Sequence, residues 1–291
     1  MTINASQQKS FFDAHCHLSF APDPDRFAAW VAQRYAGAFS TTVSPRDFSR
    51  AQQLFAPWES LKVGFGAHPW WVSTGEVTAR DIEMAAATIE QTPYIGEVGL
   101  DFGRNGLARS VFATEEETKA AQVDVLRSVF AACAWGEAEG GATAEDDAQG
   151  FVDARDVCRV FSFHAVRSAD VILDLLQEYE LLSGNAAIFH WFSGSSAQLQ
   201  RARELGCHFS VNAFMLNTKR GREYAKAIPA GQLLVETDLP EETEDDADAE
   251  AFEVACAQYA EALDSAYDQL VALRGPDILI AIEKNVQRIF G

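Results

Sequence analysis

Short apolar runs recur along the whole chain and alternate with segments in which apolar residues follow helical spacing. The runs that predict strands cover residues 10–18, 36–43, 63–68, 94–100, 159–164, 186–192, 208–211 and 233–236. Between them, apolar residues three and four positions apart, such as Val171, Leu175 and Leu176, are typical of amphipathic helices. Strands that alternate with helices pair in parallel, so the pattern predicts an α/β fold, a TIM-like (β/α) barrel with eight parallel strands.

Two stretches interrupt this alternation. Residues 136–156 are rich in Gly, Ala, Glu and Asp, and we expect an acidic insertion there because the barrel needs no such length. Residues 241–253 follow the last predicted strand and are also acidic. They are either a solvated loop that leads into a helix from Ala251 or a lid that filters substrates. We expect residues 1–291 to form a single barrel domain with these two additions.

The composition predicts a soluble, folded protein. Hydrophobic residues make up 48% of the chain and charged residues 23%, which is enough apolar surface for a sizeable core. No apolar run reaches the roughly 18 residues of a membrane span, so we expect no membrane partner. The five cysteines are scattered and include no Cys-x-x-Cys pair, which favours reduced thiols and a cytoplasmic location. No obligatory protein partner is evident.

The net charge of −20 bears on the choice of partner. A protein that holds phosphate backbones by charge normally carries a basic face, and this sequence has no basic run. The charge therefore speaks against tight binding of nucleic acid, although it does not exclude catalysis on it.

Two histidines stand one residue apart in the apolar segment 11–18. In a β-strand alternate side chains project from the same face, so Asp13, His15 and His17 would point one way and Ala14 and Cys16 the other. Two imidazoles that converge in this manner could bind a divalent cation. Alone, the pair is equally compatible with two polar residues at the end of a strand.

Ionisable residues also stand at the ends of other predicted strands. They are His68, Glu97, His164, His190 and Asp238. In a parallel barrel all strands end at one face, where catalytic groups cluster. A set of imidazoles and carboxylates suits Zn²⁺, Mn²⁺ or Fe²⁺, and a carboxylate such as Glu97 could bridge two cations. The pattern therefore predicts a two-metal hydrolase, whereas His208, which lies in no motif, is assigned to structure.

Six motifs occur in the order found in one known family. They are the segments 13–18 (DAHCHL), 66–69 (GAHP), 95–101 (IGEVGLD), 163–164 (FH), 190–194 (HWFSG) and 236–240 (ETDLP). With these motifs the chain resembles the TatD-type metal-dependent hydrolases of the amidohydrolase superfamily. The resemblance runs from about Phe11 to Phe290 and includes residues 285–290, which are similar to the closing helix of that family.

The resemblance implies a TatD-like deoxyribonuclease of the 3′-to-5′ exonuclease type that hydrolyses a phosphodiester of DNA with two divalent metal ions (Zn, Mn, Mg or Fe). The metal ligands that it implies are His15, His17, Glu97, His164, His190 and Asp238. Glu97 would bridge the two ions, and Asp238 would also orient or deprotonate the attacking water. His68 and Arg167 would contact the substrate, while Asp13 and Asp101 would orient metal ligands.

Two departures from the family pattern bear on the substrate. One residue more than usual separates His164 from Arg167, which displaces Arg167 from the position of phosphate contact. After Pro240 the family has an aromatic and basic loop, whereas this chain has the acidic residues 241–253. An acidic rim favours a neutral or cationic substrate, so a small ester, lactone or amide remains an alternative. A non-catalytic barrel that binds a partner is the third interpretation, although every expected metal ligand is present.

Overall fold

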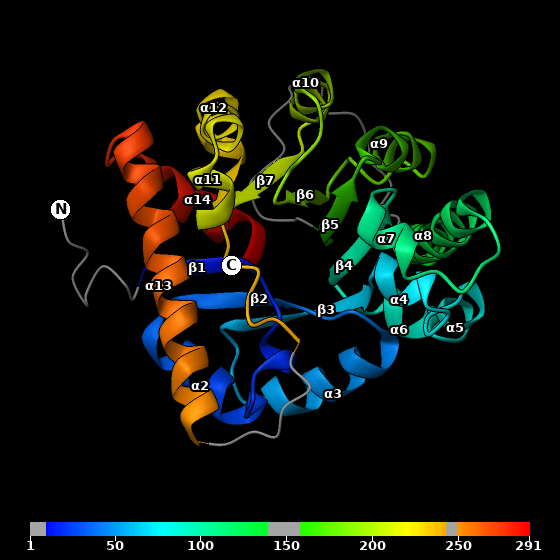
Figure 1. Ribbon diagram of the computed structural model, residues 1–291, viewed down its shortest axis with the longest axis horizontal. Coiled ribbons are helices and arrows are strands. Elements are labelled where there is room, and N and C mark those ends of the chain that lie inside the picture. Colours follow the sequence, from blue (N-terminus) through cyan, green and yellow to red (C-terminus); the bar gives the residue numbers. More distant parts are fainter. Residues whose placement is uncertain (1–9, 139–157, 243–248) are drawn as a thin grey trace.

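The computed structural model describes residues 10–138, 158–242 and 249–291 and consists of a barrel of parallel strands surrounded by helices (Figure 1). The strands are β1 (Phe12–Cys16), β2 (Gly37–Thr41), β3 (Leu61–Ala67), β4 (Tyr94–Asp101), β5 (Val160–Val166), β6 (Ala186–His190), β7 (His208–Val211) and β8 (Leu233–Val235). Each strand pairs in parallel with the next along the chain, in the order β1 to β8. The predicted α/β barrel is confirmed, with each strand close to its expected position.

Helices fill the connections between the strands. The α-helices are α2 (Pro24–Arg34), α3 (Pro45–Phe55), α4 (Pro69–Ser73), α5 (Ala79–Met84), α6 (Ala86–Glu90), α7 (Arg104–Ala108), α8 (Glu115–Ala138), α9 (Ala169–Glu178), α10 (Ser196–Glu204), α11 (Ala213–Asn217), α12 (Lys219–Ala227), α13 (Ala249–Arg274) and α14 (Ile278–Phe290). Two 3₁₀ turns, η1 (Leu18–Phe20) and η2 (Ala230–Gln232), complete the set. Local sequence explains several helix starts: Ser44 caps α3, whose first residue is a proline, and Thr78 forms a capping box with Asp81 in α5.

The first strand closes the barrel against the residues that follow β8. The Asp238 N–H donates to the His15 carbonyl at 3.0 Å, and the His17 N–H donates to the Leu239 carbonyl at 2.9 Å. The buried Asp13 carboxylate accepts from the Thr237 backbone N–H at 3.0 Å and from its hydroxyl at 2.6 Å. This closure brings both ends of the barrel sequence to one site.

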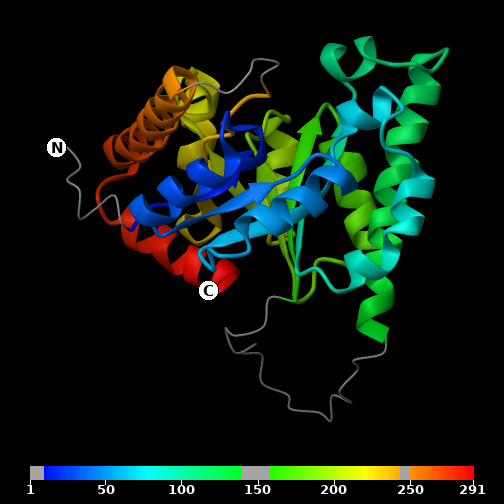
Figure 2. The same cartoon turned by 90° about the horizontal axis from the view of Figure 1, so that it is seen from below.

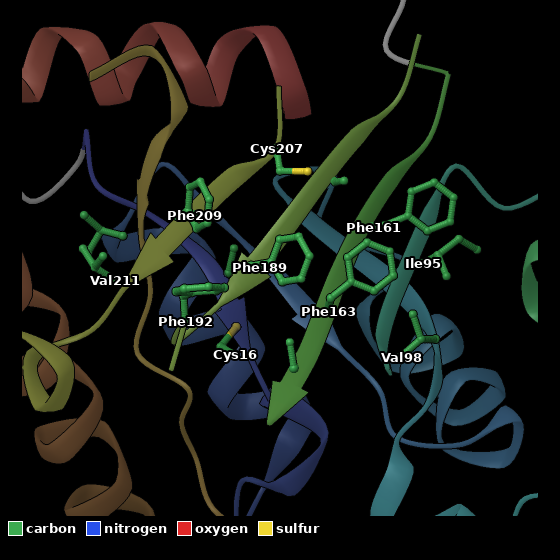
Figure 3. Packing of buried hydrophobic residues seen from close by; sticks show 14 of the residues in the cluster. Cys16, Ile95, Val98, Phe161, Phe163, Phe189, Phe192, Cys207, Phe209 and Val211 are labelled. Carbon is green, nitrogen blue, oxygen red and sulfur yellow. The ribbon is translucent and has the colours of Figure 1, made fainter. Parts of the chain in front are cut away.

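The core has an outer layer between strands and helices and a smaller inner cluster. In the outer layer Phe161 and Phe163 of β5 pack against Phe130 of α8. Phe189 of β6 and Phe209 of β7 extend the same layer beside Phe161 and Phe163 (Figure 3). In the inner cluster Phe12 and Phe39 pack against Phe290 of α14, which covers the end of the barrel where the strands begin. Helices α8 and α13 flank the strands on opposite sides (Figure 2).

One prediction about strand β1 is wrong in detail. Simple alternation would place Ala14 and Cys16 on one face, but Ala14 packs in the inner cluster and Cys16 in the outer layer. The pairing between β1 and β2 shifts register between Asp13 and Cys16, which breaks the two-residue period there.

The acidic segments lie largely outside the described residues. Of the predicted insertion 136–156, residues 136–138 end helix α8 and the rest is not described. Of the acidic stretch 241–253, residues 243–248 are not described, and the helix that follows begins at Ala249 rather than at Ala251. Among the described helices, none combines the length and the hydropathy that a membrane span requires.

Candidate metal centre

The carboxylate of Glu97 lies at the centre of a cluster of buried histidines at the carboxyl ends of the strands. Glu97 lies on β4 and is 1% exposed, and its side chain reaches the cavity at the mouth of the barrel. Its two oxygens face different partners. The barrel brings together all six residues predicted as metal ligands, which are His15, His17, Glu97, His164, His190 and Asp238.

The Oε2 atom of Glu97 faces the residues from the start and the end of the barrel. Nε2 of His15 and Nε2 of His17 each lie 3.4 Å from this oxygen. Oδ1 of Asp238 lies 3.5 Å from Nε2 of His15 and 3.3 Å from Nε2 of His17. Two imidazole nitrogens and two carboxylate oxygens therefore converge on one point.

The Oε1 atom of Glu97 faces three other histidines. His164 on β5 approaches it with Nδ1 at 2.8 Å, and His190 on β6 approaches it with Nε2 at 2.9 Å. Nε2 of His68, which follows β3, lies 3.2 Å away. A second group of donors thus surrounds the other oxygen of the same carboxylate.

Hydrogen bonds made away from Glu97 orient the first pair of histidines. Nδ1–H of His17 donates to the Thr41 carbonyl at 3.0 Å, because a carbonyl only accepts. Nδ1 of His15 shares a hydrogen bond of 2.6 Å with the Ser162 hydroxyl. In the neutral ring the proton on Nδ1 leaves Nε2 of His17 with a lone pair that faces the donor cluster, as a metal ligand requires.

Two further carboxylates lie next to the second pair of histidines, His164 and His190. Oδ2 of Asp101 lies 3.4 Å from Nε2 of His164 and accepts from the Trp70 indole N–H at 2.6 Å. Oε1 of the fully buried Glu236 lies 3.8 Å from Nδ1 of His190. Asp101 thus helps to fix the ring orientation of His164, whereas Glu236 lies beside His190 without a hydrogen bond to it.

His68 differs from the other histidines in its proton. Its Nδ1 accepts the Trp70 backbone N–H at 3.1 Å, so in the neutral ring the proton is on Nε2. Burial lowers the pKa of His68 to about 4, which keeps the ring neutral. Nε2–H then donates towards Glu97 and has no lone pair for a cation, although His68 lies in a group close enough to bind one.

The histidines keep both central carboxylates ionised. Burial opposes ionisation of Glu97, but the nearby histidines outweigh it and hold its pKa well below the usual range. Burial likewise opposes ionisation of Asp238, but the neighbouring histidines, His17 first among them, outweigh it, so this pKa is also lowered. Ionised carboxylates at neutral pH are the form that binds cations.

The donor set fits a divalent cation. The ligand atoms of His15, His17 and Glu97 all lie within 4.8 Å of one another, as do those of His68, Glu97 and His164 and those of His15, His190 and Glu236. Buried imidazole and carboxylate donors suit transition-metal ions better than they suit Ca²⁺. The chain therefore has a buried site for divalent metal.

The cluster lies at the bottom of an open cavity of about 970 Å³. Its lining includes His17, His68, Glu97, His164, His190 and Asp238, together with Glu241 and Glu242 from the acidic segment. Arg109, whose guanidinium carbon lies 4.5 Å from the Trp70 ring centroid, is the single lysine or arginine in the lining formed by the described residues. A cavity of this size holds a nucleotide-sized ligand.

Arg167 does not line the cavity, although the family resemblance implied that it would contact the substrate. Strand β5 continues to Val166, so Arg167 falls in the turn beyond it with a φ of 56°. Its side chain is exposed and does not line the cavity. The extra residue after His164 accounts for this displacement.

Sequence reasoning gave no role to several residues of the site. The Ser162 hydroxyl and the Thr41 backbone carbonyl orient histidines, yet neither a lone serine in a strand nor a main-chain carbonyl carries a sequence signal of that role. Glu236 is in the same motif as Asp238, and this was the one available hint. Arg109 enters the cavity from the segment after α7, where nothing in the sequence distinguishes it.

The fold and the site together define a class: a parallel (β/α) barrel with a histidine and carboxylate metal centre where its strands end. Residues 12–135 and 151–291 match the family described as TatD related DNase. This match covers most of the chain, and the chain belongs to that family.

Curated relatives and solved structures agree with the assignment. Proteins named 3′-5′ ssDNA/RNA exonuclease TatD from Shigella flexneri serotype 5b and Escherichia coli K12 are 28% and 27% identical, over 79% of this chain and 78% of each relative. A crystal structure of a TatD homologue from Escherichia coli K12 has a TM-score of 0.65 at 19% identity and covers 96% of this chain and 97% of that one. A TatD family hydrolase from Entamoeba histolytica has the same TM-score at 15% identity, with 96% of both chains covered.

Proposed function

We propose that this protein is a metal-dependent hydrolase that removes nucleotides from the 3′ end of single-stranded nucleic acid. The observation that carries the proposal is the divided environment of Glu97, with one donor group at each carboxylate oxygen. Hydrolases of phosphodiesters commonly use two cations bridged in this way. The names of the curated relatives, 3′-5′ ssDNA/RNA exonuclease TatD, support the substrate and the polarity.

The proposed centre holds two divalent ions. His15, His17 and Asp238 would hold one, His164 and His190 the other, and Glu97 would bridge them. Bound cations supply Lewis-acid chemistry, which activates water and neutralises charge on a phosphate group. The donors accept Zn²⁺, Mn²⁺, Mg²⁺ or Fe²⁺, and availability commonly decides among such ions.

Three side chains complete the proposed chemistry. Asp238, whose lowered pKa keeps it a carboxylate, would orient the attacking water and accept its proton. His68 would donate its Nε2 proton in a hydrogen bond to a substrate oxygen that gains charge. Arg109 would bind a phosphate at the rim, since its guanidinium group suits phosphate geometry.

The test is digestion of a 5′-labelled single-stranded oligonucleotide with Mn²⁺, Mg²⁺ or Zn²⁺. We expect progressive shortening from the 3′ end with at least one of the ions, and no cleavage of a circular single strand. A protein that shortens no DNA or RNA strand with any of these ions would refute the proposed function.

A second candidate is a hydrolase of a small neutral ester, lactone or amide. Glu241 and Glu242 favour it because they place acidic side chains at the cavity rim, where they repel a polyanion. Simple esters and lactones in the same assay distinguish the two candidates. Turnover of these compounds without cleavage of oligonucleotides would establish the second one.

A further inference from the structure

Two aromatic side chains are exposed at the rim of the cavity, and the metal centre uses neither. Trp191 is 40% exposed and Phe214 is 53% exposed. Their ring centroids lie 5.7 Å apart with an angle of 14° between the planes, so the two rings are stacked. Both side chains line the cavity that contains the metal donors. Exposed apolar surface of this kind commonly marks a binding site.

The buried carboxylate of Glu236 fixes this aromatic pair relative to the metal centre. Oε1 of Glu236 accepts the Trp191 backbone N–H at 3.0 Å and the Asn212 side-chain N–H at 3.0 Å. Asn212 in turn caps α11, the short helix that carries Phe214. The same carboxylate lies 3.8 Å from His190. One buried group therefore links both members of the pair and lies beside a metal donor.

The backbone at Trp191 is held in an unusual conformation. Its φ is 36°, in the left-handed region that large side chains rarely adopt. The hydrogen bond to Glu236 maintains this conformation directly after the metal donor His190. Such strain tends to persist where surrounding structure fixes a functional side chain.

The aromatic residues elsewhere in the cavity are already engaged. Trp70 donates its indole N–H to Asp101 and lies under the guanidinium of Arg109. Trp71 stacks with Phe20, with ring centroids 6.2 Å apart, and both are only partly exposed. Trp191 and Phe214 are thus the aromatic pair with most surface open to a ligand.

The charge of the protein also points to stacking. A chain with a net charge of −20 and a single lysine or arginine among the described lining residues gains little from phosphate contacts. Stacking of a base on an aromatic ring adds to affinity without requiring positive charge.

We propose that Trp191 and Phe214 form a stacking platform for one nucleobase of a single-stranded substrate, next to the phosphodiester that is cleaved. This inference rests on the proposed function, because it assigns the base-binding part of that active site. The platform sets affinity and leaves the chemical step to the metal centre.

The first experiment compares KM and kcat of the wild-type metal-loaded enzyme with those of Trp191→Ala, Trp191→Phe and Phe214→Ala on oligothymidylate. We expect KM to rise about tenfold in both alanine variants, with kcat changed less than about threefold, and Trp191→Phe to retain most of the affinity. The matched control is Phe112→Ala, which removes a ring that is 37% exposed but lies outside the cavity lining. Thermal unfolding of each variant verifies that it is folded.

The second experiment removes the base instead of the ring. A set of oligonucleotides, each with one abasic site at one of the four 3′-terminal positions, is tested on wild type and on Trp191→Ala. At one position the abasic site raises the wild-type KM about tenfold and adds little in the variant, because base and ring belong to one interaction. Fully additive losses at every position would overturn the proposal.

The outcomes separate this inference from the proposed function. If wild type cleaves no nucleic acid, the proposed function fails and the platform fails with it. If wild type cleaves normally and both alanine variants keep its KM, only the platform is overturned. A wild-type dimer that both variants convert into monomers, with KM unchanged, would instead identify the pair as a contact between two copies of the chain.

Discussion

At His17 and His68, a hydrogen bond to the backbone sets the role of one ring nitrogen. The Thr41 carbonyl fixes the proton of His17 on Nδ1, which leaves Nε2 free for a cation. The Trp70 N–H does the opposite at His68, where it occupies Nδ1. Two histidines that look alike in the sequence therefore differ in the ring nitrogen that carries the proton in the neutral form, because their hydrogen-bond partners differ.

Asp238→Ala tests the proposed proton acceptor. The change removes a metal donor and the carboxylate that orients water, so we expect kcat to fall about 1,000-fold or more. The side chain is 20% exposed and not part of the apolar core, so the melting temperature of the metal-free protein should change little. Near-normal turnover would refute the assigned role. Asp124→Ala, on an exposed position of α8, is the matched control and should keep wild-type activity.

His208 predicts a pH dependence of stability. It accepts a hydrogen bond from Arg288 at 2.8 Å, and burial, helped by the Arg288 charge, lowers its pKa from 6.5 to about 4. As the pH falls, the unfolded chain therefore takes up a proton on His208 before the folded chain does. The contribution of neutral His208 to stability is fully present above pH 6.5 and is lost as the pH falls towards 4. Relative to His208→Gln, the wild type should lose about 2 kcal/mol of unfolding free energy between pH 7 and pH 5.

Urea unfolding of both proteins at several pH values measures this difference. The site histidines titrate in both proteins and cancel in the comparison. Parallel curves for the wild type and His208→Gln would show that His208 is not buried in its neutral form.

Neighbouring strands supply the precision of the metal centre. Glu97 comes from β4 and His164 from β5, so their separation depends on how closely these two strands pair. Gly99 allows that approach: its φ is 142°, and a Cβ placed there would lie 2.1 Å from the His164 carbonyl oxygen. The absence of a side chain at this position is therefore a requirement of the site.

Gly99→Ala should force β4 away from β5. We expect a loss of about 3 kcal/mol or more in unfolding free energy, together with weaker metal binding. Denaturant unfolding and metal titration measure the two effects. Gly231→Ala is the control, since a Cβ there meets nothing within 4 Å. Equal stability of the two variants would contradict the strand-contact argument.

At the scale of the whole molecule, the barrel is closed between β1 and the residues after β8, and the chain is strongly acidic. The donors that face Oε2 of Glu97 come from residues near the start of the chain and from the segment after β8. Folding must therefore be complete before this half of the centre exists. The chain has a net charge of −20, although we propose that its cavity binds a polyanion.

Metal should stabilise the folded chain, because the unfolded chain lacks the assembled donors. A ligand at 100 times its Kd adds about 2.7 kcal/mol, which corresponds to a rise in melting temperature of roughly 5 °C. Thermal scans in EDTA and with added Mn²⁺ measure this shift. The shift should be smaller in Asp238→Ala, and the absence of any shift in wild type would contradict the metal assignment.

Salt should have an unusual effect on substrate binding. A basic nuclease loses affinity steeply as salt rises, because it forfeits counterion release. In this acidic protein salt also screens the repulsion between the protein and the substrate phosphates. We therefore expect the KM for oligothymidylate to change less than about threefold between 50 and 200 mM KCl. A KM that rises many-fold over this range would indicate an extensive phosphate-binding surface that the described cavity lacks.

The sequence by itself determined the order of strands and helices, the barrel and the identity of the residues that gather around Glu97. Those features follow from local periodicity and from the rule that parallel strands end at one face. Only the tertiary structure decided which oxygen of Glu97 each histidine faces, and that His68 carries its proton on Nε2. It also turned Arg167 out of the cavity, brought Arg109 in, and stacked Trp191 on Phe214. These outcomes depend on strand register and on contacts between residues distant along the chain, which no local pattern encodes.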